Sequence, residues 1–82
     1  MSLMRTELQI IELFTKAVFE IERKELSGVR PETDISTLGF DSVTTMEILS
    51  HIEEELDIEF PEEELGNIYL MSDLVVLVQS LL

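Results

Sequence analysis

Residues 38–56 read LGFDSVTTMEILSHIEEEL, and this stretch determines how the rest of the chain is interpreted. Apolar residues recur every three or four positions, which predicts an amphipathic helix over Ser42–Leu56. Asp41 is placed to cap that helix, because its carboxylate can accept a hydrogen bond from a free N–H of the first turn. Ser42 then occupies an exposed corner at the positive end of the helix dipole, where a phosphate ester is stabilised.

The two faces of this predicted helix differ in character. With about 100° per residue, one face gathers the apolar side chains that would pack in a core. These core candidates are Ile48, Leu49, Ile52 and Leu56, together with Thr45. The opposite face carries two apolar residues and a serine rimmed by carboxylates, which predicts a docking surface for a partner. Its residues are Val43, Met46, Glu47, Ser50, Glu53 and Glu54.

The segment before this stretch predicts one helix and a long loop. Residues 4–25 have apolar side chains at helical spacing, so we expect an amphipathic helix that serves as scaffold. Pro31 blocks its continuation, and the loop that follows is expected to include a helical turn near Thr33–Leu38 and to fix where Ser42 points. The expected core stripe of the first helix is Leu8, Ile11, Phe14, Val18 and Ile21.

The segment after this stretch predicts a short helix and a longer one. Pro61 can open the short helix, with three glutamates in its first turn. Ser72 is the expected cap of the last helix, whose core face is Leu74, Leu77, Val78 and Leu81. The sequence therefore predicts an all-α fold, a small antiparallel bundle of three main helices plus one short helix.

Length and composition predict one domain over residues 1–82. Because a second methionine follows at position 4, residues 1–3 could be a cloning scar. Cysteine is absent, which excludes a disulfide framework and a thiolate metal site. No apolar run is long enough to span a membrane, and no signal peptide is apparent, so we expect a cytoplasmic protein.

The net charge of −13 is unevenly distributed. Residues 31–82 contain thirteen acids and no Lys or Arg, whereas residues 1–30 contain all five basic residues. Repulsion from phosphates excludes nucleic-acid binding by the acidic part. A partner with a basic patch is the expected complement.

The sequence offers no constellation for catalysis or metal binding. His51 is the only histidine, and Ser42 has no activating base at a readable spacing. Neither Asp34 nor Asp57 begins a loop with the ligand spacing of a calcium site. We therefore expect no catalytic residue and no metal site.

From Asp41 onward the chain resembles an acyl carrier protein, a small helical protein that holds acyl groups as thioesters on phosphopantetheine. The resemblance is carried by the LGFDSV turn, Glu47, the EEELDIEFPEEE segment over residues 53–64, and Ile68. It implies that Ser42, next to Asp41, bears a 4′-phosphopantetheine arm taken from coenzyme A. It also implies that Ile68 joins the second helix in binding partners.

The resemblance further implies a stand-alone, monomeric carrier that is not itself an enzyme. Its partners would be a phosphopantetheinyl transferase and the acyl-loading and acyl-processing enzymes of fatty acid, polyketide or specialised lipid synthesis, each with a basic patch. Thr44, Ser50, Tyr69 and Leu70 depart from the pattern of fatty-acid carriers, which favours a specialised carrier. Two alternatives stay open: an aminoacyl or peptidyl carrier, and an acidic adaptor that keeps the fold without a prosthetic group.

Overall fold

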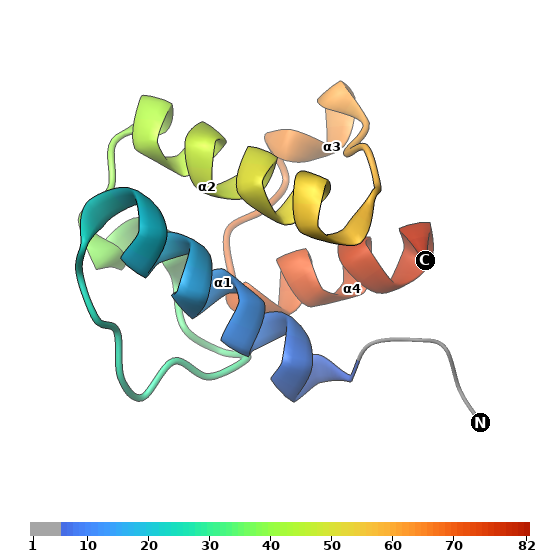
Figure 1. Cartoon of the computed structure of the whole chain (residues 1–82). Helices are drawn as coiled ribbons and strands as arrows, with labels where there is room; N and C mark the ends of the chain where they lie inside the picture. The colour runs from blue at the N-terminus through green and yellow to red at the C-terminus, as the bar shows by residue number, and fades with distance from the viewer. Residues whose placement is uncertain (1–5) are drawn as a thin grey trace.

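The computed structural model describes residues 6–82, and its regular elements are helical. Figure 1 shows helix α1 running in the opposite direction to α2 and α4, with the short α3 between the latter two along the chain. The predicted all-α bundle of three main helices and one short helix is confirmed. The elements are α1 (Glu7–Glu22), the 3-10 helix η1 (Ile35–Leu38), α2 (Ser42–Leu56), α3 (Glu62–Leu65) and α4 (Met71–Leu81).

Helix α1 is shorter than its sequence predicts. Thr6 caps it, since the Thr6 hydroxyl accepts from the Gln9 N–H at 3.1 Å and the Gln9 side chain accepts from the Thr6 N–H at 2.8 Å. The helix ends because Arg23 adopts a left-handed conformation (φ 55°) and its N–H donates to the Phe19 carbonyl. The expected helix over residues 4–25 was therefore wrong at its C-terminal end, and residues 4 and 5 lie outside the described residues.

The core stripe of α1 is also rotated from the predicted one. Leu8, expected in the core, is 65% exposed, whereas Ile10 and Ala17 are fully buried. The cause is that α1 packs against both α2 and α4, so its buried face is wider than one stripe and centred differently. Among residues 6–82 the core contains no buried polar side chain. It consists of Ile10, Ile11, Phe14, Ala17, Val18, Ile35, Ile48, Leu49, Ile52, Phe60, Met71, Leu74, Val75 and Val78.

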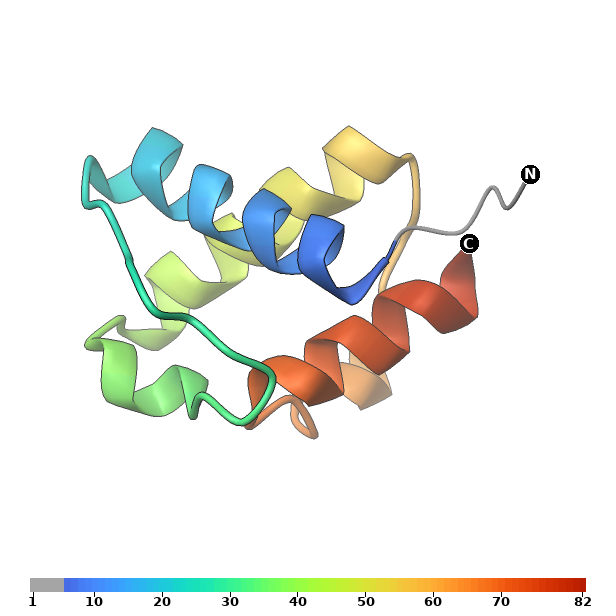
Figure 2. The same ribbon diagram turned by 90° about the horizontal axis from the view of Figure 1, so that it is seen from below.

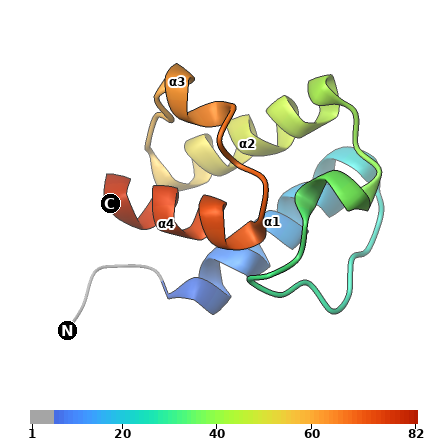
Figure 3. The same ribbon diagram turned by 180° about the vertical axis from the view of Figure 1, so that it is seen from behind.

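The long loop between α1 and α2 is fastened to the start of α4. The Ile35 N–H donates to the Tyr69 carbonyl at 2.9 Å, and the Met71 N–H donates to the Thr33 carbonyl at 2.8 Å. Figures 2 and 3 show this loop passing beside the first turn of α4. Because η1 follows directly from the fastened segment, the loop sets the position from which the chain turns into α2, as predicted.

The start of α4 differs from the predicted one. Ser72 was expected to cap this helix, but the helix begins at Met71, two residues earlier than that cap predicts, and the Ser72 N–H donates to the Pro31 carbonyl at 2.8 Å. Leu70 is the N-cap residue, and Asp73 in the first turn supports it, since its carboxylate accepts from the N–H groups of Tyr69 (3.0 Å) and Leu70 (2.8 Å). The predicted short helix after Pro61 is confirmed as α3. No helix among the described residues is long and apolar enough to cross a membrane.

Candidate functional site

Ser42 is the first residue of α2 and is exposed. It lies on a corner that is shaped by Gly39 and Asp41. Gly39 ends η1 with φ 87°, a conformation that favours glycine, and so allows the sharp turn into α2. The Asp41 carboxylate accepts from the Thr44 N–H at 2.7 Å, and the Asp41 carbonyl accepts from the Thr45 N–H at 3.0 Å. The predicted cap and the predicted bounds of the helix are both confirmed.

The electrostatics of this corner are dominated by Asp41. The hydrogen bond from the Thr44 N–H stabilises the ionised form and lowers the pKa of the Asp41 carboxyl below its usual value of 3.8. The backbone N–H groups of Leu70 and Tyr69 lower the pKa of Asp73 in the same way. Both carboxylates are therefore fully charged at neutral pH.

The lowered pKa of Asp41 predicts a specific loss of stability in acid. A carboxylate with a depressed folded-state pKa contributes its stabilisation above the unfolded-state value, about 3.9, and loses it as the pH falls toward the lower folded value. Asp41→Asn keeps a capping side chain but does not titrate. We expect melting curves between about pH 6 and pH 2 to show a steeper acid destabilisation for the wild type than for Asp41→Asn. Parallel pH profiles would contradict this assignment.

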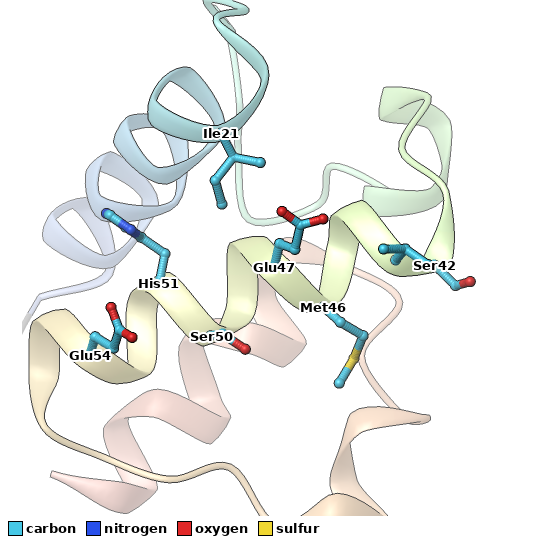
Figure 4. Close-up of a pocket in the computed structure, with 8 residues that line it drawn as sticks. Ile21, Ser42, Met46, Glu47, Ser50, His51 and Glu54 are labelled. Carbon is cyan, nitrogen blue, oxygen red and sulfur yellow. The ribbon is translucent and has the colours of Figure 1, made fainter.

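A shallow groove of about 630 Å³ runs along α2 away from Ser42 (Figure 4). Figure 4 shows Glu47 facing Ile21 of α1 across this groove, while the Met46 side chain extends on the other side of α2. We call this hollow the α2 groove. It is lined by Ile21, Ser42, Val43, Met46, Glu47, Ser50, His51 and Glu54. Five of the six residues predicted for a docking surface thus lie together beside the serine.

Glu53, the sixth predicted docking residue, does not line the α2 groove. Its carboxylate accepts from the Phe60 N–H at 2.6 Å and so holds the segment that leaves α2. Ile68, which was also predicted to bind partners, lines a second hollow that also reaches Ser42. Most of the predicted docking residues therefore line the α2 groove, whereas Glu53 bonds to the Phe60 backbone and Ile68 lines the second hollow.

The second hollow, called the inner pocket here, has a volume of about 280 Å³ and also reaches Ser42. Its walls come from α1, η1, α2, α3 and the segments that follow η1 and α3, and most of them are apolar. It is lined by Phe14, Ile35, Ser36, Phe40, Ser42, Thr45, Met46, Leu49, Leu65, Ile68 and Tyr69. No sequence pattern predicts this pocket directly, and the signal for it is the apolar Phe40 next to the Asp41–Ser42 pair.

His51 lies in the α2 groove and points toward α1 (Figure 4). Its Nε2 atom is 3.9 Å from a Glu55 carboxylate oxygen and makes no hydrogen bond. No base is seen hydrogen-bonded to the Ser42 hydroxyl within residues 6–82. In the same part of the chain, no three His, Asp or Glu side chains converge as metal ligands would.

Comparison with known proteins relates this geometry to one family. The family model described as the phosphopantetheine attachment site matches residues 9–74. An acyl carrier protein homolog of Mycoplasmopsis pulmonis is 31% identical over 63 residues, which cover 77% of this chain and 86% of that protein. The chloroplastic acyl carrier protein SF2 of Brassica campestris is 38% identical over 69 residues, with 78% of this chain and 52% of that protein covered.

The fold has a relative among solved structures as well. The crystal structure of an acyl carrier protein from Thermotoga maritima superimposes with a TM-score of 0.81 and 28% sequence identity. The superposition covers 88% of this chain and 85% of that one. The structural similarity therefore extends over most of this chain.

Proposed function

Because the chain belongs to the acyl carrier protein family, whose members carry a phosphopantetheine group, we propose that Ser42 is the attachment site and that the protein presents acyl thioesters to biosynthetic enzymes. The observation that supports this assignment best is the placement of Ser42, exposed at the first position of α2 and shared by the α2 groove and the inner pocket. When bound, the arm supplies the terminal thiol that forms the thioester.

The residues around Ser42 fit such an arm. The Ser42 hydroxyl is exposed and can become a phosphodiester without displacing a buried group. The start of α2 offers backbone N–H groups and the positive end of the helix dipole to the phosphate. The two hollows leave room for the arm on either side of the corner. Asp41 holds the helix start in place through its bond to Thr44 and leaves the serine side chain free.

Ser42 needs an enzyme to acquire the arm, because no base is hydrogen-bonded to its hydroxyl within residues 6–82. A hydroxyl is a weak nucleophile until a neighbouring group removes its proton. We therefore assign activation of Ser42 to a phosphopantetheinyl transferase, with coenzyme A as the donor. On this proposal the protein is a substrate and carrier and is not itself an enzyme.

The inner pocket gives the carrier a place to shelter part of its cargo. Its walls are mostly apolar and begin at Ser42, so an acyl chain that folded back could be removed from water there. Each buried methylene stabilises the sheltered form by about 0.8 kcal/mol. Apolar cargo is thus the class that the pocket favours, and fatty acyl, polyketide and specialised lipid chains all belong to it.

The attachment is tested by intact mass. Wild-type protein incubated with coenzyme A and a broad-specificity transferase should gain one phosphopantetheine group. Peptide mapping should then place that group on the segment that contains Ser42. A protein that gained no mass would favour the alternative of an acidic adaptor without a prosthetic group, and a group on another residue would contradict the assignment.

The α2 groove is proposed as the surface that partner enzymes recognise. Val43 and Met46 are 67% and 45% exposed beside the serine, and Glu47 and Glu54 flank them. Glu47→Lys and Glu54→Lys should change the free energy of unfolding by only about 0.5 kcal/mol, because both positions are exposed. Each should slow loading by the transferase, most strongly at low salt, since charges at the rim of an interface act mainly on the association rate.

Two further variants separate docking from general charge. Met46→Ala should weaken the docked complex at every salt concentration, because it removes apolar contact. Glu12→Lys changes the net charge as much as Glu47→Lys does, but its position is on the exposed side of α1. The loading rate of Glu12→Lys, measured at low and at high salt, should be close to that of the wild type. If Glu12→Lys slowed loading as much as Glu47→Lys, net charge would explain the effect and the α2 groove would lose its role.

A further inference from the structure

Lys24 lies beside the corner of the molecule that carries Ser42. Its ammonium is 5.8 Å from the centroid of the Phe40 ring, and Phe40 precedes Ser42 by two residues and lines the inner pocket with it. Figure 1 shows that the chain leaving α1 and the start of α2 lie at the same end of the bundle. The contact with Phe40 thus places a cation beside the residue that precedes Ser42 by two positions.

Lys24 has no acidic partner among the described residues. Within residues 6–82, the one ion pair closer than 4.0 Å joins His51 and Glu55. This is unexpected in a chain with 18 acids, several of them near Lys24 in sequence. Lys24 is exposed and keeps its charge available for an anion that is not part of the polypeptide.

The corner of Ser42 is poorly suited to a further negative charge without such a cation. Asp41 is ionised there, because the Thr44 N–H lowers its pKa. Residues 31–82 contain no Lys or Arg, so neither α2 nor the rest of this acidic part supplies a compensating charge. A phosphodiester on Ser42 would therefore be repelled by its surroundings, apart from the N–H groups of the helix start.

We propose that Lys24 is the counter-ion of the phosphodiester on Ser42, an inference that rests on the proposed attachment of phosphopantetheine there. The flexible four-carbon stem of lysine allows its ammonium to turn from the face of Phe40 toward the phosphate. Arg23 is not assigned this role, because its guanidinium faces Phe19 on α1 and not Phe40. Lys24 is thus a positioning residue for the arm, and its effect should appear only after loading.

The test compares the melting temperatures of the apo and loaded forms of each variant. We compare the change in melting temperature that loading causes at about 10 mM salt. For Lys24→Gln this change should be on the order of 2–5 °C lower than for the wild type, as expected for the loss of one exposed ion pair in a small domain. Lys24→Arg should restore the wild-type shift. The difference should disappear at about 0.5 M salt, where exposed charges are screened.

Lys16→Gln is the matched control, because it removes the same charge from an exposed position in the body of α1. It should keep the wild-type shift on loading. An unchanged shift in Lys24→Gln, or an equal loss in Lys16→Gln, would overturn the proposal. If wild-type Ser42 accepted no arm, the mass spectrum would show that the proposed function had failed first, so the two failures are distinguishable.

Discussion

Replacement of Ser42 by alanine is expected to abolish attachment of phosphopantetheine, from one group per molecule to none. The change removes the hydroxyl that would form the phosphodiester and touches little else, because Ser42 is exposed and the cap of α2 is made by Asp41. We therefore expect the circular dichroism spectrum and the free energy of unfolding to stay within about 0.5 kcal/mol of the wild type. Intact mass after incubation with coenzyme A and the transferase measures the outcome.

Ser36 provides a matched control for this variant. It is also an exposed serine at the edge of the inner pocket, but it lies in η1 and its hydroxyl donates to the Asp34 carboxylate at 2.6 Å. Ser36→Ala should accept one arm, as the wild type does. Labelling of Ser42→Ala, or loss of labelling in Ser36→Ala without unfolding, would show that the corner at Ser42 is not the attachment site.

Replacement of Phe14 by alanine is expected to produce the largest loss of stability. Phe14 is 1% exposed, lies in the centre of the core and also forms a wall of the inner pocket. Truncating a buried phenylalanine costs about 3–5 kcal/mol, because apolar contacts are lost and a cavity is left. A domain of this size has on the order of 4–12 kcal/mol of stability in total. Urea unfolding should show a much lower midpoint, and the protein should be close to unfolding at 37 °C.

Leu8 serves as the control for this prediction, because the sequence placed both residues on one apolar stripe. The structure leaves Leu8 65% exposed, so Leu8→Ala should change the free energy of unfolding by about 0.5 kcal/mol or less. Similar unfolding midpoints for the two variants would contradict the packing of α1. A modest loss in Phe14→Ala would mean that the pocket wall closes over the deleted ring.

The contrast between α2 and α1 shows what could be predicted from sequence. Both ends of α2 were predicted correctly, because the Asp41 cap and the apolar spacing up to Leu56 are local signals. The end of α1 was not predicted correctly, because the left-handed residue that ends it is Arg23 and not a glycine, which would have been a sequence signal. The cap of α4 was misassigned to Ser72, which is a good capping residue, because hydrogen bonds with the distant loop and the Asp73 carboxylate place the helix start at Met71, after Leu70.

The helices, the exposed Asp41–Ser42 corner and the acidic character of residues 31–82 could be predicted from the sequence, because capping, periodicity and charge depend on neighbours along the chain. Tertiary packing set which face of α1 is buried, where the loop between α1 and α2 is fastened, and that the Glu53 carboxylate accepts from the Phe60 N–H. It also created the inner pocket and brought Lys24 to Phe40. These features join residues from different helices and loops, so they arise only when the packed core brings distant segments together.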